Sequence, residues 1–191
     1  MDTTHPSLLL RLKDHRDAAA WQVFDDIYRP MMERFALVRG LAPADAEDVV
    51  QQCMAALADH IRSFEYDPAK GRFKSWLRTM VNNKVRNFVR DRREVAGDSG
   101  PFRDLASPEA SAEEVFEKLW KQEHLWHCLR RIEAQVDATT FTAFRLFVLE
   151  QRPVEEVSAA SGLSANNVYT IKWRLTQKVA EMMAELVGDD G

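Results

Sequence analysis

The chain has 191 residues, of which 46% are hydrophobic and 29% charged, and its formal net charge is −4. This composition supports a buried core and excludes a disordered or membrane-embedded protein. No apolar run approaches the length of a membrane span, and the first residues lack the basic start and apolar stretch of an export signal. We therefore expect a cytoplasmic protein with no membrane insertion.

An enzyme is not expected from this sequence. None of the short motifs that mark common nucleotide-binding or hydrolytic sites occurs, so we predict no catalytic residue and no cofactor. Cys53 and Cys128 fall in amphipathic segments, which indicates reduced thiols rather than a disulfide. His124 and His127 are spaced by one helical turn, but no further ligands can be placed beside them, so no metal site is predicted.

The periodicity of apolar residues is helical almost throughout, which predicts an all-α protein. Small and helix-breaking residues are concentrated between residues 96 and 111, and this composition is typical of a flexible linker. We therefore predict two helical domains, 1–95 and 112–187. Helices of the first domain are expected over 8–14, over 18–38, from Pro43 to about Ile61, and from after Gly71 to about Arg93.

The helix that starts at Pro43 has two different faces. Its apolar stripe is Val50, Cys53, Leu57 and Ile61. Acidic and amide side chains occupy another side: Asp45, Asp48, Gln52 and Asp59, with Glu47 and Gln51 nearby. Acids in a first turn favour the helix dipole without any partner, and nothing around them indicates a catalytic pair of carboxylates.

Basic charge is concentrated in one segment. Residues 70–93 hold nine basic side chains and one acid, a net +8, so the rest of the chain carries −12. One side of the predicted helix presents Arg78, Asn82, Arg86, Arg90 and Arg93, with Asn83 at its margin. Arginine suits phosphate and asparagine suits base edges, whereas the alternative is a solvated or salt-bridged face. The preceding loop, 64–73, mixes aromatic and basic residues that could stack an unpaired base or merely anchor the loop.

The last segment has the pattern of a helix-turn-helix. A short helix over 153–161 is followed by Gly162 as a tight turn and by Ser164 as the N-cap of a second helix. The apolar stripe of the second helix is Val168, Ile171, Leu175, Val179, Met182 and Leu186. Its opposite face is Asn166, Tyr169, Thr170, Trp173, Arg174 and Gln177, which suits a DNA groove. The alternative is a plain helical hairpin whose aromatic residues pack on a neighbour.

Three segments together resemble a known family over nearly the whole chain. They are G-L-A-P-A-D-A-E-D-V-V-Q at 40–51, G-R-F-K-S-W-L-R-T-M-V-N-N at 71–83, and V-E-E-V at 154–157 leading to Val168 and Tyr169. In this order they resemble the extracytoplasmic-function (ECF) sigma factors of bacterial RNA polymerase. These factors pair a promoter-melting helical domain, called region 2, with a helix-turn-helix domain, called region 4.

The resemblance implies three sets of contacts. The core polymerase would be bound by Asp45, Glu47, Asp48, Gln51 and Gln52, through the clamp coiled coil of its largest subunit. The minus-ten promoter DNA would be bound and melted by Phe64, Lys70, Arg72, Arg78, Asn82, Arg86, Asn87, Arg90 and Arg93. The minus-thirty-five DNA would be bound by Ser164, Asn166, Asn167, Tyr169, Thr170, Trp173, Arg174 and Gln177.

The resemblance therefore predicts a promoter-specificity subunit whose partners are core polymerase and promoter DNA. Tyr169 and Ile171 depart from the family, because basic residues are common at these positions, and this departure leaves the promoter sequence open. No sensory domain is visible after Leu186, so regulation is expected from an anti-sigma factor or another signal. The main alternative is a stand-alone helix-turn-helix regulator, and a third is a module that binds a polymerase or regulator without touching DNA.

Overall fold

The computed structural model describes residues 6–63, 73–96 and 111–187, with side chains for 8–63, 73–92 and 111–185. Every regular element in these ranges is helical, which confirms the predicted all-α class. The chain divides into two compact units, between Glu123 and His124. In the described ranges, no helix combines the length and apolar character needed to cross a bilayer.

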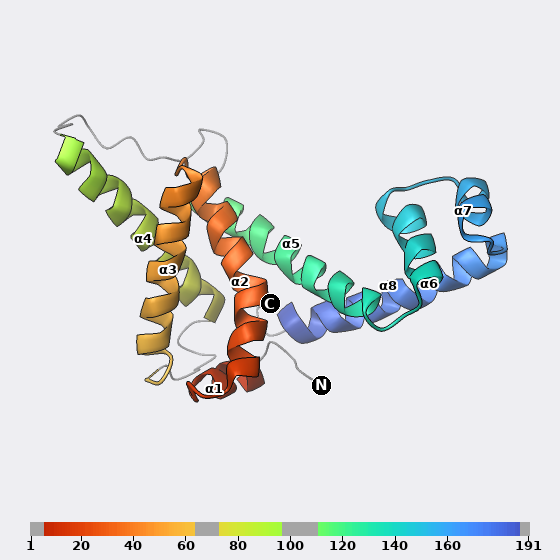
Figure 1. Ribbon diagram of the computed structural model, residues 1–191, viewed down its shortest axis with the longest axis horizontal. Helices are drawn as coiled ribbons and strands as arrows, with labels where there is room; N and C mark the ends of the chain where they lie inside the picture. Colours follow the sequence, from red (N-terminus) through yellow and green to blue (C-terminus); the bar gives the residue numbers. More distant parts are fainter. Residues whose placement is uncertain (1–5, 64–72, 97–110, 188–191) are drawn as a thin grey trace. The chain divides into compact units, whose positions relative to one another are not determined.

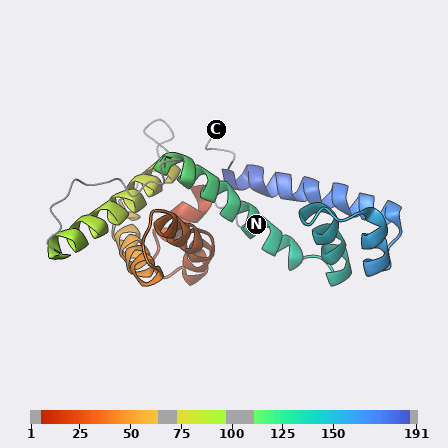
Figure 2. The same ribbon diagram turned by 90° about the horizontal axis from the view of Figure 1, so that it is seen from above.

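The first unit is a helical bundle (Figures 1 and 2). Consecutive helices pack on one another, α1 on α2, α2 on α3 and α3 on α4. The helix predicted over 18–38 has these bounds in the structure, and the one predicted over 8–14 begins and ends two residues earlier. Its helices are α1 (Pro6–Leu12), α2 (Ala18–Val38), α3 (Pro43–His60), α4 (Phe73–Ala96) and the first half of α5 (Ala112–Glu133).

Asp17 fixes the start of α2. Its carboxylate accepts a hydrogen bond from the Ala20 amide at 2.9 Å and another from Arg11 Nε at 2.7 Å. The Arg11 hydrogen bond and the amide lower the pKa of Asp17 from 3.8 to about 2. Because the folded pKa is below the unfolded one, this carboxylate stabilises the fold above about pH 4 and loses that effect as the pH falls towards 2.

We expect Asp17→Asn to lower the urea midpoint at pH 7, and we expect the difference from the wild type to shrink below pH 4. Circular dichroism melts in urea at several pH values measure this. An unchanged difference from pH 7 to pH 3 would contradict the assigned role of the Asp17 charge.

The start of α5 belongs to the core of the first unit. Phe116, Leu119 and Trp120 are buried there, and the Trp120 ring lies 5.3 Å from the Tyr28 ring. The predicted second domain begins at residue 112. The structure instead divides the chain near the middle of α5, between Glu123 and His124. The reason is that the apolar side of this half-helix is covered by α2 and α4 side chains. The predicted linker, 96–111, falls outside the described residues except at its two ends.

Both thiols are enclosed. Cys53 and Cys128 are fully buried, and burial raises their pKa values to about 12 and about 11. We expect neither thiol to react with Ellman's reagent at pH 8 in the native protein, and both to react within seconds in guanidinium, because the thiolate is the nucleophile. Stoichiometric reaction of either thiol before unfolding would contradict this.

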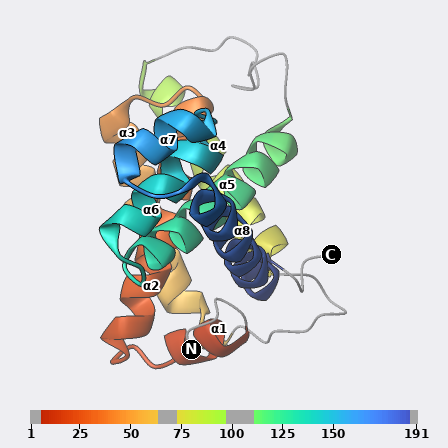
Figure 3. The same cartoon turned by 90° about the vertical axis from the view of Figure 1, so that its right-hand side faces the viewer.

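The second unit contains the helix-turn-helix (Figure 3). Its elements after α5 are α6 (Ala138–Phe144), the π-helical turn η1 (Arg145–Leu149), α7 (Val154–Ser161) and α8 (Ala165–Val187). Gly162 adopts the left-handed conformation with φ 72°, which closes α7 and turns the chain. The Ser164 hydroxyl then accepts a hydrogen bond from the Asn167 amide at 3.3 Å, as predicted for an N-cap.

The two helices of the helix-turn-helix pack on each other. Val157 of α7 and Val168 of α8 are buried, and Ile171 and Leu175 continue the buried stripe. α6 packs on both helices. The opposite side of α8 is thereby left at the surface.

Candidate nucleic-acid interface

α4 is amphipathic as predicted. Leu77, Val81 and Val85 are buried against the core of the first unit. On the other side, Arg86, Asn87 and Arg90 are exposed, and Arg78 and Asn82 are partly exposed. Of the remaining predicted minus-ten residues, Phe64, Lys70 and Arg72 lie outside the described residues, as does the side chain of Arg93.

A surface hollow of about 370 Å³ lies on the exposed side of α4. Asn83, Arg86, Asn87 and Arg90 line it. Two guanidinium groups supply fixed donors for phosphate oxygens, and two amides can donate to and accept from base edges. Arg90 also contacts the carboxylate of Asp91 at 2.9 Å, but both side chains are exposed and such a surface pair is weak. A polyanion could displace it.

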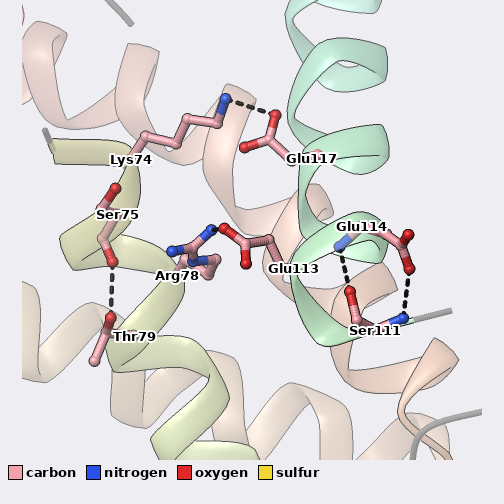
Figure 4. Close-up of polar contacts among 8 residues, drawn as sticks. All are labelled: Lys74, Ser75, Arg78, Thr79, Ser111, Glu113, Glu114 and Glu117. Atoms are coloured by element: carbon pink, nitrogen blue, oxygen red, sulfur yellow. Dashed lines mark hydrogen bonds and ion pairs between the residues drawn. The ribbon is translucent and has the colours of Figure 1, made fainter.

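The other end of this basic side is partly neutralised by α5. Arg78 forms an ion pair with Glu113, and Lys74 Nζ lies 2.7 Å from Glu117 Oε2 (Figure 4). Lys74 also lies over the Trp120 ring, 5.7 Å from its centroid. The strip predicted on α4 did not include these acids, because they lie on another helix. The side chains of Arg86 and Arg90 are exposed, whereas that of Arg78 is only partly exposed.

A capping box positions the acids of α5. The Ser111 amide donates to Glu114 Oε2 at 2.7 Å, and the Glu114 amide donates to the Ser111 hydroxyl at 3.2 Å (Figure 4). Hydrogen bonds from the Ser111 amide and the Ser111 side chain to the Glu114 carboxylate lower the pKa of Glu114. The fixed helix start sets the register that brings Glu113 and Glu117 to α4. The S-x-x-E spacing of Ser111 and Glu114 is a sequence signal from which the start of α5 could have been predicted.

The acidic and amide face of α3 is exposed as predicted. The predicted stripe from Val50 to Ile61 is buried, whereas Glu47, Asp48, Gln51 and Gln52 are exposed. Asp45 is half-buried because it pairs with Arg92 of α4. A second hollow, of about 450 Å³, has Gln52 on one side and Lys84, Phe88 and Arg92 on the other. The α3 face and the basic side of α4 therefore adjoin on the first unit.

The predicted reading face of α8 is at the surface in the second unit. All eight predicted residues are exposed, including Tyr169 at 51% and Trp173 at 68%. Ser164 is also the helix cap, so its hydroxyl has a structural role whether or not DNA is bound. Phe147 of η1 was not predicted beside this face. Its ring makes an edge contact with Tyr169 at 5.4 Å and lies under Lys172.

The two histidines weighed as metal ligands are buried. His124 is fully enclosed and His127 is 8% exposed, and each has interactions with its surroundings. In the part of the chain that the structure describes, no three His, Cys, Asp or Glu side chains gather in a way that could hold a metal ion.

Residues 26–95 match the family described as sigma-70 region 2. The matched range contains most of α2, all of α3 and nearly all of α4, so both adjoining faces lie within it. The match spans less than half of the chain and supports the sigma-70 family predicted from the motifs.

A known sigma factor supports the group within the family. The protein named ECF RNA polymerase sigma factor RpoE, of Cereibacter sphaeroides, is 26% identical over 88 residues. The alignment covers 46% of this chain and 48% of the relative, so the chain spans about half the length of that relative. The name agrees with the extracytoplasmic-function group that the motifs predict.

Proposed function

We propose that this chain is a dissociable sigma subunit, which binds bacterial core RNA polymerase and directs it to specific promoters. One observation carries the proposal: an exposed acidic and amide face on α3 adjoins an exposed Arg and Asn side of α4 within a sigma-70 region 2 domain. The first face suits a basic protein partner, and the second suits DNA. The role needs no catalytic group of the chain's own, and it would be carried out in the cytoplasm with the polymerase.

The α3 face is the proposed contact with polymerase. It presents Asp48, Gln51 and Gln52 together at the surface, with Glu47 beside them, and Asp45 at its edge is held by Arg92. Carboxylates and amides at an interface set specificity and speed association with a positive partner. The negative charge carried by the residues outside 70–93 would then favour docking on the polymerase.

The α4 side is the proposed contact with the minus-ten DNA. Arg86 and Arg90 would hold phosphates while Asn83 and Asn87 meet base edges in the hollow between them. Melting would need no hydrolysis, because unstacking a base costs a few kcal/mol, which such contacts can offset. Arg78 would join the interface only when its pair with Glu113 opens.

The α8 face is the proposed contact with the minus-thirty-five DNA. Residues of the N-terminal half of a second helix-turn-helix helix normally meet base edges in the major groove. Neither unit would bind DNA strongly alone, since the overall net charge is −4. Polymerase would present both units together and raise their effective concentration. An anti-sigma factor is a further proposed partner.

Transcription with purified core polymerase tests the proposal. Genomic fragments would be transcribed with and without the chain, and the 5′ ends of the transcripts sequenced. We expect discrete start sites that appear only with the chain and share two upstream elements. Start sites that are unchanged by the chain would contradict it. Sequence-specific binding of the chain to DNA without polymerase would favour the stand-alone regulator instead.

A further inference from the structure

The exposed face of α8 has an unusual composition for a DNA-reading surface. Projected at about 100° per residue, Asn166, Trp173 and Gln177 fall within about 40° of one another, opposite the buried stripe. Thus the centre of the face is an indole ring between two amides. Arg174 lies to one side of this centre and Lys172 to the other.

The positive charge of this part of α8 indicates that its exposed face binds a polyanion. From Ser164 to Ala180 the helix and its cap carry Lys172, Arg174 and Lys178 and no acid. Cations at both margins of a helix suit the two phosphate ridges of a groove, which leaves the centre facing the bases. Lys172 is kept at the margin by its place over the Phe147 ring, 5.4 Å from the centroid.

The two aromatic side chains are available to an apolar contact. Trp173 is 68% exposed, and it makes no hydrogen bond, ion pair or ring contact with any residue that the structure describes. Tyr169, one turn before it, is braced edge-on by Phe147 and still 51% exposed. A large indole ring at the centre of an exposed face gains most from burial against an apolar group.

The major groove offers one apolar group, the C5-methyl of thymine. The amides beside the indole have a matching preference, because Asn and Gln pair with the N6 and N7 edge of adenine. The guanidinium that would favour guanine is at the margin, at Arg174. The centre of the face is therefore complementary to A·T pairs on both strands.

We infer that α8 selects an A·T-containing minus-thirty-five element, with Trp173 packed on a thymine methyl group and Asn166 and Gln177 contacting adenine. This inference rests on the proposed sigma function and goes beyond it, because it names the base chemistry that is read.

Deoxyuridine substitution provides the test, because deoxyuridine pairs as thymine does but lacks the methyl group. The chain with core polymerase would first select minus-thirty-five elements from a randomised library. Each thymine of the selected element would then be replaced in turn by deoxyuridine. We expect A·T pairs to be enriched and at least one substitution to lower affinity about fourfold, the scale of one buried methyl group.

Variants separate the indole contact from other causes. In Trp173→Ala the deoxyuridine penalty should disappear, and in Trp173→Phe part of it should remain. Trp126→Ala is the matched control, because Trp126 is 42% exposed on α5 in the same unit and lies outside the helix-turn-helix. It should keep the full penalty.

Two results overturn the inference and can be told apart. If the polymerase complex selects an element but tolerates every deoxyuridine, or keeps the penalty in Trp173→Ala, the sigma function stands and the methyl contact is wrong. If no element is selected because no complex with polymerase forms, the proposed function itself fails and the inference fails with it.

Discussion

Replacing Arg86 and Arg90 together by alanine is expected to reduce promoter opening by about a hundredfold while leaving polymerase binding unchanged. Each guanidinium lines the α4 hollow, and a hydrogen bond to a charged group is worth about 1.5–3 kcal/mol, or at least about tenfold. Both side chains are exposed, so the fold should keep its stability. Permanganate footprinting of the melted strand measures opening.

Salt dependence distinguishes phosphate contacts from a structural effect. Each lost phosphate contact should reduce the slope of log affinity against log salt by about one, so the double variant should lose about two. Arg16→Ala combined with Lys118→Ala is the matched control, because both side chains are exposed in the same unit and lie outside the predicted interface. Equal loss of opening in this control would show that removing any two cations suffices, which contradicts the α4 interface.

Asp48→Arg is expected to weaken binding to core polymerase by about thirtyfold or more. Asp48 is exposed near the start of α3, and removing one member of a charge pair at an interface costs about 2–5 kcal/mol. Reversal of the charge adds repulsion from a basic partner surface. Fluorescence anisotropy of a labelled chain titrated with core polymerase measures the affinity.

Glu33→Arg is the control for the Asp48 variant. Glu33 is exposed on α2 of the same unit, so its replacement makes the same change in net charge away from the α3 face. We expect its affinity to stay within about twofold of the wild type. If both variants lose affinity equally, overall charge and not the α3 face controls binding.

Local signals explain the elements that could be predicted. The start of α2 at Ala18 follows from Asp17, which caps the helix through the Ala20 amide. The turn at Gly162 and the cap at Ser164 depend on residues within a few positions of one another. Amphipathic periodicity was enough to sort the faces of α3, α4 and α8 correctly. In each case the deciding interactions are short-range or repeat along a single helix.

The features that were missed depend on contacts between distant segments. Glu113 reaches Arg78 across 35 positions of sequence, and nothing on α4 itself indicates that pair. The burial of Trp120 in the first unit likewise depends on where α5 packs, which a linker-based boundary cannot reveal. Phe147 contacts Tyr169 because η1 continues α6 as a π-helical turn. The periodicity of apolar residues does not distinguish a π-helical turn from an α-helical one.

Size-exclusion chromatography of the chain mixed with bacterial core RNA polymerase tests the central claim most directly. At micromolar concentration the account predicts that the chain elutes with the polymerase, at a position well before that of the free 22.0 kDa protein. Elution of all of the chain at its free position, with the polymerase active on another sigma factor, would contradict the account.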